Sequence, residues 1–484
     1  MRTMLTTARA VAAGQPAAPG QPAALQRAST IANAARPCLP SVPPRRTIST
    51  ATVVDGGRSL SIDGYEYPAI YLRDNCPASV HPTTLQRTVP VWDLPPSREL
   101  TLDTVDVQRG GDNNGAATAA TVRYTDGHTS TFPASWFPEH RLDDASRLER
   151  HVVGARELKS WAGTQALPGG ELIALDFEEV MGGGDALLEF LDATATWGFV
   201  KLTGVGAVEG QFARLAELVG HARETNYGTT FNVKVCDDAA INQAFTSAAL
   251  PLHTDLPFYQ LPPGVQVLHC IEQATLSPEA GRSLFVDGLA VAKRLREVDA
   301  AAYRVLCDVP VVFEDVFSGE SGEPGGAEGA KGFHLRAERP VITEFSPSPV
   351  VAPASLASAL DLGLGAGEAI PVEVNFNDGV RASEMNVAPA MMVEFYSAIA
   401  AFAAIAHSPE MAVEIKLQAG EAVAFQNRRV LHGRRAIEGG EGGEEGEEGT
   451  GEGGGGSNSR WLQGGYIDLD AIHSKRRALR VWGR

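Results

Sequence analysis

The sequence predicts a mainly β protein with flanking helices, built from a small N-terminal β-rich domain and a larger domain with a jelly-roll-like double sheet. Three observations predict this fold class. Short strand patterns and turns fill the segment from Ser59 to about Trp161. Apolar extended segments recur beyond residue 190, and helical patterns between them are few. A parallel sheet would need a helix after nearly every strand, so a double sheet is expected instead.

Length and composition exclude several classes of protein. With 484 residues the chain is longer than one ordinary domain, so two domains plus tails are expected. The hydrophobic content of 44% is normal for a globular protein. The net charge of −18 argues against nucleic acid as a partner. No apolar run is long enough to span a bilayer, so no membrane partner is expected. The five cysteines are scattered and odd in number, which suits a reducing compartment.

Residues 1–54 differ from the rest of the chain. They contain six arginines, no lysine and no acidic residue, and Ala, Ser, Thr and Pro fill the gaps. This composition is typical of a mitochondrial transit peptide, so we expect a disordered leader and a location in the mitochondrial matrix. A disordered basic tail on a cytoplasmic protein is the alternative. Without this segment the chain carries a net charge of −24.

The N-terminal domain is expected over residues 55–165. Segment 98–107 alternates between apolar and polar residues, with a phase slip near Thr104. Segment 120–132 also alternates in part, and its Asp126-Gly127 dipeptide is a hairpin signal.

The larger domain is expected over residues 170–484. Its predicted elements are strands at 197–204, 265–270, 283–287 and 422–427 and a helix at 211–222. Apolar residues from Phe395 to Ala406 recur at helical spacing and predict a helix with an apolar face toward the core. The segments 318–332 and 438–459 are rich in Gly and Glu. They cannot bury enough apolar surface to offset the entropy of ordering, so we expect disordered surface insertions there.

His253, Asp255 and His432 are the most informative candidate site residues. The tripeptide His253-Thr-Asp255 follows an extended segment, where alternate side chains project to the same face. His432, from a remote strand, would complete a set of two imidazoles and one carboxylate. That set leaves coordination positions open and suits an Fe(II) ion that must bind an oxidant. A hydrogen-bonded structural role is the alternative for any single one of these residues.

A series of motifs in matching order indicates the family. They are Tyr71-Leu-Arg-Asp-Asn-Cys-Pro77, Asp126-Gly-His128, Trp197-Gly-Phe-Val-Lys-Leu-Thr-Gly204, His253-Thr-Asp255, Pro262-Pro-Gly-Val-Gln-Val-Leu-His-Cys270, Val286-Asp-Gly288, Asn375-Phe-Asn377 and Leu431-His-Gly-Arg-Arg435. From about residue 59 to its end, the sequence resembles the gamma-butyrobetaine dioxygenase and trimethyllysine dioxygenase family of carnitine synthesis. The resemblance implies a double-stranded β-helix domain, Fe(II), 2-oxoglutarate as cosubstrate, O2, ascorbate as reductant, and a homodimer.

The resemblance also assigns roles to residues near the metal. It implies that His253, Asp255 and His432 bind the iron. Arg460 matches the cation that binds the distal carboxylate of 2-oxoglutarate, a task that suits the forked guanidinium. Arg434 and Arg435 lie nearer to His432 in sequence and are the competing assignment. By contrast, His269 lies beside Cys270 on a predicted core strand and is expected to be structural.

Substrates of this family carry a quaternary ammonium group, which aromatic faces recognise because it cannot donate conventional hydrogen bonds. The matching residues are Tyr227, Phe231, Phe245 and Tyr466, with Asn242 and Asn377 at the positions that hold the substrate carboxylate. Ordinary core packing is the alternative role for each aromatic residue.

The family's N-terminal domain usually binds zinc through three cysteines and a histidine, and here the sequence departs from that pattern. Cys76 and His128 are retained, Ala78 and Ser79 occupy the cysteine-rich stretch, and His81 is close enough to substitute. A structural zinc site needs about four ligands, so the domain is expected to close by apolar packing unless these residues retain the metal.

Three functions remain open from the sequence. The segments Leu250-Pro-Leu-His-Thr-Asp255 and Pro262–Cys270 resemble the butyrobetaine branch more closely, which implies hydroxylation of gamma-butyrobetaine to L-carnitine. Trimethyllysine is the alternative substrate, but no acid beside Asn242 provides a contact for its α-amino group. A non-catalytic binding protein that keeps only the fold is the second alternative, and the intact His-Asp-His set together with Arg460 argues against it.

Overall fold

The computed structural model describes residues 48–110, 116–234, 244, 246–274, 277–317, 332–346, 369–437 and 460–483. The chain divides into a first unit that ends at Asp143 and a second unit that begins at Asp144. This boundary lies earlier than the predicted one, between 165 and 170. Helix α3 (Asp144–Glu157) belongs to the second unit, where Glu157 forms an ion pair with Arg476. Its polar sequence gave no apolar signal that would have assigned it there.

The first unit contains two antiparallel sheets, in the orders β1-β2-β3 and β4-β5-β6, among its described residues. Their strands are β1 (Ala51–Val54), β2 (Ser59–Ile62), β3 (Tyr65–Pro68), β4 (Leu102–Arg109), β5 (Ala117–Tyr124) and β6 (Thr129–Pro133). Short helices α1 (Ala69–Asp74) and α2 (Trp136–Glu139) follow β3 and β6. Apolar residues from both sheets share one core cluster, which includes Leu60, Tyr67, Val122 and Phe132.

Two local predictions for this unit are confirmed. The phase slip near Thr104 coincides with a shift of the β4–β5 register between Leu102 and Thr104. Asp126-Gly127 forms the turn between β5 and β6, and Gly127 has a φ of 87°. In contrast, the last residues of the predicted disordered leader, 1–54, are ordered. The β-branched segment Ala51–Val54 pairs with β2, and Ile48 is buried in the same core. Residues 1–47 lie outside the described residues.

The second unit is built around two further sheets, within the residues described. The larger sheet has the order β7-β8-β18-β11-β20-β9, and the smaller one has the order β10-β19-β12-β17. All neighbours in them are antiparallel except β7 and β8. Their bounds are β7 (Ala174–Asp176), β8 (Phe199–Thr203), β9 (Phe231–Lys234), β10 (Leu250–His253), β11 (Val265–Glu272), β12 (Ser283–Asp287), β17 (Ala412–Ile415), β18 (Ala422–Gln426), β19 (Val430–Arg434) and β20 (Trp461–Ile467). Side chains of both sheets, among them Phe199, Phe285 and Phe425, meet in one apolar cluster, so the sheets pack face to face.

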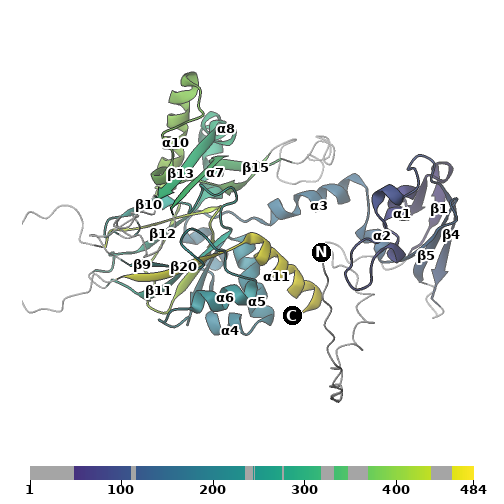
Figure 1. The fold of residues 1–484 in the computed structure, drawn as a ribbon, viewed down its shortest axis with the longest axis horizontal. Coiled ribbons are helices and arrows are strands. Elements are labelled where there is room, and N and C mark those ends of the chain that lie inside the picture. Colours follow the sequence, from purple (N-terminus) through teal and green to yellow (C-terminus); the bar gives the residue numbers. More distant parts are fainter. Residues whose placement is uncertain are drawn as a thin grey trace, which may run out of the picture. The chain divides into compact units, whose positions relative to one another are not determined.

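Helices cover the outer sides of this pair of sheets (Figure 1). They are α4 (Phe177–Met181), α5 (Gly184–Thr196), α6 (Gln211–Val219), α7 (Gly288–Val298), α8 (Ala300–Asp308), α10 (Met392–Ala406) and α11 (Leu469–Trp482). Helices α5, α6 and α11 share an apolar cluster with β8, β11, β18 and β20. Helices α7, α8 and α10 share another with β10 and β13. The second unit therefore has four layers, in the order helices, sheet, sheet and helices. The cavity described below is lined by strands of both sheets.

Two hairpins extend the second unit. They consist of β13 (Pro310–Phe317) with β14 (Phe333–Pro340), and β15 (Ile342–Phe345) with β16 (Ile370–Val374). The predicted insertions, 318–332 and 438–459, fall almost wholly outside the described residues, so they stay predictions.

Helix α10 corrects one expectation from the sequence. The segment Pro389–Ala406 is long and apolar enough to cross a membrane by length and composition alone. In the folded unit the helix buries Phe395, Ala398, Phe402 and Ala406 against the core, as its spacing predicts. Between these positions, Ile399, Ile405 and several alanines add to the high hydropathy of the whole segment.

Candidate active site

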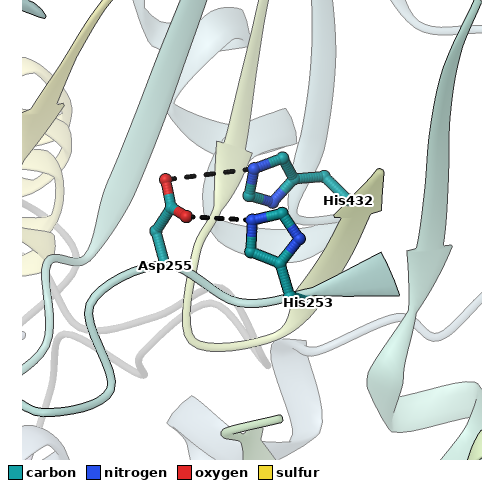
Figure 2. A group of neighbouring side chains, drawn as sticks. All are labelled: His253, Asp255 and His432. Carbon is teal, nitrogen blue, oxygen red and sulfur yellow. Dashed lines mark ion pairs between the residues drawn. The ribbon is translucent and has the colours of Figure 1, made fainter. Parts of the chain in front are cut away.

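Two neighbouring strands bring the three candidate metal ligands together. Strands β10 and β19 are antiparallel, and their register places His253 directly opposite His432. Asp255 follows β10 two residues after His253. Figure 2 shows the two imidazole rings side by side, with the Asp255 carboxylate facing both. The ring centroids lie 4.3 Å apart.

The distances suit a single metal ion. The Asp255 Oδ1 atom lies 3.1 Å from His253 Nε2, and Oδ2 lies 3.9 Å from His432 Nε2. One ligand atom from each residue lies within 4.8 Å of the others, and no other such group of His, Cys, Asp and Glu occurs among the described residues. Two imidazoles and one carboxylate with open coordination positions fit Fe(II).

Hydrogen bonds orient the ligands from behind. The His253 Nδ1 atom lies 2.8 Å from the Pro251 carbonyl oxygen, to which it donates, and this leaves the Nε2 lone pair for a metal. Asp255 Oδ2 accepts hydrogen bonds of 2.7 Å from Gln266 Nε2 and from the Tyr466 hydroxyl. The backbone N–H of Asp255 donates to Asn427 Oδ1. The carboxylate is therefore held in place by the protein itself.

The charges of the group also favour metal binding. Burial raises the pKa of Asp255, but His432, His253 and the Tyr466 hydroxyl outweigh burial and hold this pKa well below its usual range. Burial and the neighbouring His253 lower the pKa of His432 to about 3. Burial lowers the pKa of His253, but the hydrogen bond to Asp255, the charge of Asp255 and two backbone contacts together outweigh burial and raise this pKa. At neutral pH, Asp255 is ionised and His432 is neutral, and these are the forms that donate to a metal.

Arg460 is a buried cation that has no anionic partner within the described residues. It precedes β20, its exposed fraction is 4%, and its Nε atom has no hydrogen-bond partner. Burial, with a contribution from Arg434, lowers the pKa of Arg460 to about 9. A buried charge of this kind is costly unless it is paired, so the position fits an anionic ligand.

The two competing arginines have other partners. The guanidinium of Arg434 donates to the carbonyl oxygens of Ala244, Thr246 and Ala248 at 2.5–3.0 Å. Arg435 lies at the surface and forms an ion pair of 2.6 Å with Glu414. Of the three candidates, Arg460 therefore has the guanidinium most available to an anionic ligand, within the part of the chain that the structure describes.

A cavity of about 860 Å³ joins these groups. Its walls include His253, Asp255, His432, Arg460, Tyr227, Phe231, Tyr466, Asn377, Asp315, Phe285 and residues of α10. A cavity of this volume can hold two small ligands, since ligand pockets commonly span 300–1,000 Å³.

Similarity to known proteins decides the family. A sequence model described as "Taurine catabolism dioxygenase TauD, TfdA family" matches residues 157–448, which is more than half of the chain. The chain belongs to this family. A gamma-butyrobetaine dioxygenase from Pseudomonas sp. (strain AK-1) is 31% identical over 434 residues, which cover 88% of this chain and 94% of that protein. The gamma-butyrobetaine dioxygenase of Homo sapiens is 29% identical over 446 residues, with coverages of 90% and 97%. A trimethyllysine dioxygenase from Neurospora crassa is 25% identical over 464 residues, with coverages of 89% and 83%.

The resemblance expected from the motifs is confirmed, and the chain is a 2-oxoglutarate-dependent dioxygenase. Membership of the TauD, TfdA family implies Fe(II) and 2-oxoglutarate. The residues fit both groups, because the donor set of His253, Asp255 and His432 suits the metal and the buried Nε of Arg460 lacks a partner. The non-catalytic alternative is set aside.

In this dioxygenase, three of the predicted cage aromatics line the same cavity as the candidate iron site. The ring centroids of Tyr227 and Phe231 are 6.4 Å apart, and those of Phe231 and Tyr466 are 5.3 Å apart. The fourth, Phe245, lies outside the described residues.

The glycines before Tyr466 leave room for two aromatic rings. A Cβ atom on Gly464 would lie 2.5 Å from the Phe231 ring, and one on Gly465 would lie 2.0 Å from the Phe212 ring. Because successive residues of β20 face opposite sides, Gly464 leaves room for the Phe231 ring in the cavity and Gly465 for the Phe212 ring of α6.

The predicted carboxylate-binding asparagines have different outcomes. Asn377 lines the cavity, but its side chain already donates to the Thr254 carbonyl oxygen at 3.2 Å and accepts from the Gly379 N–H at 3.1 Å. Asn242 lies outside the described residues. His269, expected to be structural, is buried and bonds through Nε2 to the Gly206 carbonyl oxygen.

The candidate zinc residues of the first unit come together only in part. Cys76 Sγ lies 3.3 Å from His128 Nε2. The Nδ1 atom of His81 instead accepts the backbone N–H groups of Thr83 and Thr84. These residues do not form a group of three possible ligands in the described part of the chain. The apolar core around Phe132 closes the unit.

The sequence reasoning missed several supporting residues. It did not predict that the Tyr466 hydroxyl and Gln266 donate to the Asp255 carboxylate. It also did not predict that Asn427 accepts the backbone N–H of Asp255. Gln266 gave a usable signal, because it is the one polar residue in the apolar run Val265–Leu268. An amide in a buried strand needs a hydrogen-bond partner, and the nearby carboxylate provides one.

Proposed function

We propose that this protein hydroxylates gamma-butyrobetaine to L-carnitine in a reaction that depends on Fe(II) and 2-oxoglutarate. The observation that carries the proposal is the group of aromatic rings, Tyr227, Phe231 and Tyr466, in the cavity of the His-Asp-His set. Relatives named gamma-butyrobetaine dioxygenase, similar over about nine tenths of the chain, support the same substrate.

In this proposal, His253, Asp255 and His432 hold the iron, and Arg460 binds the distal carboxylate of 2-oxoglutarate. Fe(II) and 2-oxoglutarate, when bound, supply the oxidising chemistry, in which 2-oxoglutarate loses CO2 and one oxygen atom of O2 enters a C–H bond of the substrate. The protein orients these groups, and the hydrogen bonds from Gln266 and Tyr466 fix the Asp255 carboxylate.

The cage positions the cationic end of the substrate. A trimethylammonium group has no N–H to donate, so it is recognised by ring faces and shape, and each ring contributes about 0.5–2 kcal/mol when water is excluded. Asn377, and by family match Asn242, lie at the positions proposed for the carboxylate end. Binding at both ends places the intervening carbons near the iron.

We also infer that the two packed sheets of the second unit form a double-stranded β-helix. The antiparallel orders of β10-β19-β12-β17 and β8-β18-β11-β20 support this arrangement. His253 and His432 then lie on adjacent strands of one sheet, and Phe231 and Tyr466 lie on β9 and β20, the last two strands of the other.

A turnover assay tests the function. The purified protein is incubated with Fe(II), 2-oxoglutarate, ascorbate and O2, with either gamma-butyrobetaine or trimethyllysine, and the hydroxylated product and succinate are both quantified. We expect carnitine to form in equal amounts with succinate, with a kcat/KM at least tenfold above that for trimethyllysine. Efficient hydroxylation of trimethyllysine alone would establish the alternative substrate. Hydroxylation of neither would refute the proposal.

A further inference from the structure

One carboxylate in the cavity has no role in the scheme above. Asp315 lies on β13, whose register with β14 runs unbroken from Pro310 to Phe317. Alternation along the strand puts Asp315 on the same face as Val311 and Phe313. Both of these belong to the main apolar cluster of the second unit. An acid at the next position of a core-facing row is unusual, because burial disfavours its charge.

The neighbours of Asp315 place it at the aromatic end of the cavity. Its half-buried carboxylate lines the cavity, and it accepts hydrogen bonds from the Tyr227 side chain and from the backbone of Val316. Tyr227 is one of the cage residues. Burial raises the pKa of Asp315, and its charge also acts on the nearby Tyr259. The carboxylate therefore lies next to the rings that would receive the substrate cation.

Asp315 has no cationic partner among the described residues. Another cavity carboxylate, that of Asp378, forms an ion pair of 2.8 Å with Arg381. Glu314, the residue before Asp315, faces the other side of β13 and pairs with His334 and Arg336. Of the two adjacent acids, Glu314 is therefore paired with cationic side chains, whereas Asp315, which faces the cavity, is not paired with one among the described residues.

We propose that Asp315 is a specificity-determining residue, whose carboxylate, held by Tyr227, faces the cation of the bound substrate and selects it over a neutral group of the same shape. This inference rests on the proposed function, because it requires a quaternary ammonium substrate. The aromatic rings alone provide shape and a modest electrostatic attraction. A full negative charge in a cavity with little water adds an attraction that a neutral isostere does not feel. Two residues thus divide the recognition, with Tyr227 contacting the methyl groups and Asp315 compensating the charge.

The test compares gamma-butyrobetaine with 5,5-dimethylhexanoate, in which a tert-butyl group replaces trimethylammonium. The kcat/KM for each compound is measured with the wild type and with Asp315→Asn, which keeps the size and removes the charge. We expect the variant to lose about tenfold to a hundredfold in kcat/KM for the cation and less than threefold for the neutral isostere. Tyr227→Phe, which keeps the ring and removes the hydroxyl, should show a smaller loss in the same direction.

Glu314→Gln is the matched control, because it removes one negative charge from the adjacent residue on the other face. It should leave both kcat/KM values within twofold of the wild type. Affinity for gamma-butyrobetaine is also measured by calorimetry on protein loaded with Mn(II) and 2-oxoglutarate without O2. Asp315→Asn should weaken this affinity by the same factor, while the affinity for 2-oxoglutarate stays within twofold.

The outcomes separate this inference from the proposed function. If the wild type prefers the cation and Asp315→Asn retains that preference, the inference is overturned while the function stands. An equal loss for both compounds would also overturn it, since that result indicates a damaged cavity. If the wild type hydroxylates neither gamma-butyrobetaine nor trimethyllysine, the proposed function fails and the inference fails with it.

Discussion

Arg460 offers a prediction in which stability and function change in opposite directions. The variant Arg460→Met keeps most of the apolar stem and removes the buried charge. Lowering the pKa of Arg460 from 12.5 to about 9 is equivalent to an unfavourable free energy of roughly 5 kcal/mol at most. Part of this is recovered in practice, because a guanidinium retains some hydration, so we expect the ligand-free variant to be more stable by about 1–3 kcal/mol.

The size of this effect depends on pH in a definite way, and its sign does not change. Because folding lowers the pKa of Arg460, the cost of its charge is fully present at neutral pH. The cost fades only as the pH rises above about 9. The stability difference between Arg460→Met and the wild type should therefore be constant between pH 6 and 8. A gain of 1–3 kcal/mol would raise the melting temperature of a unit that spans residues 144–484 by roughly 1–4 °C.

Binding of 2-oxoglutarate should change in the opposite direction. Removing one partner of a buried, hydrogen-bonded charge pair costs about 2–5 kcal/mol, which is roughly a thirtyfold to several-thousandfold increase in Kd. Thermal unfolding without ligands measures the stability, and calorimetry on the Mn(II)-loaded protein measures the Kd. Arg435→Met is the control, since this arginine is exposed and paired with Glu414.

Two results would refute this reasoning about Arg460. Wild-type affinity for 2-oxoglutarate in Arg460→Met would show that another cation binds the cosubstrate. A fall in stability without ligands would show that its guanidinium is compensated in the folded protein. If Arg434→Met loses 2-oxoglutarate binding and keeps its stability, the competing assignment is correct. We expect instead that Arg434→Met is destabilised, because three backbone carbonyl oxygens lose their donor.

Three further predictions follow from the site. His253→Ala or Asp255→Ala should abolish turnover and reduce the iron content of the purified protein, and near-wild-type turnover in either variant would disprove the metal assignment. Tyr466→Phe should weaken Fe(II) affinity several-fold, through loss of the hydrogen bond to Asp255, and keep the preference for a cation, whereas Tyr466→Leu should also cost about 1–2 kcal/mol in substrate affinity. Equal cation preference in all three Tyr466 proteins would mean that this ring is not part of the cage. Gly465→Ala should lower the free energy of unfolding by about 1–3 kcal/mol, because the new Cβ meets the Phe212 ring, and an unchanged denaturation midpoint would contradict that packing.

The parts of this fold that could be predicted from sequence are those with a strong local pattern. Strand β12 matches the predicted 283–287, and the phase slip at Thr104 coincides with a register shift. The positions of His253 and Asp255 followed from strand periodicity, and that of His432 from a matching motif. The predictions that failed concern segments whose structure depends on tertiary contacts. The strand Ala51–Val54 lies at the end of a segment with a leader-like composition, and it is held by pairing with β2 and by packing against the core of the first unit.

Long-range pairing also explains what was missed at the site. Tyr466 lies 211 residues from Asp255 in sequence, and only the β11–β20 register places its hydroxyl on the carboxylate. The resemblance to the family predicted that the Tyr466 ring belongs to the cage, but it did not predict the hydrogen bond from the Tyr466 hydroxyl to Asp255. Similarly, Asp315 looks like an ordinary surface acid until the register of β13 shows which way it faces.

The shared position of Tyr466 constrains how this dioxygenase could acquire a new substrate. Its ring contacts Phe231 in the proposed cage, and its hydroxyl donates a hydrogen bond to the Asp255 carboxylate. A substitution of Tyr466 that reshapes the pocket therefore also disturbs a metal ligand. Phe231 lines the same cavity, and its phenyl ring has no polar group that could form a hydrogen bond with the metal ligands. During divergence, or in a laboratory library, substrate range can therefore change at Phe231 while oxygen activation is retained. At Tyr466, selection for a new substrate and selection for a working iron site oppose each other.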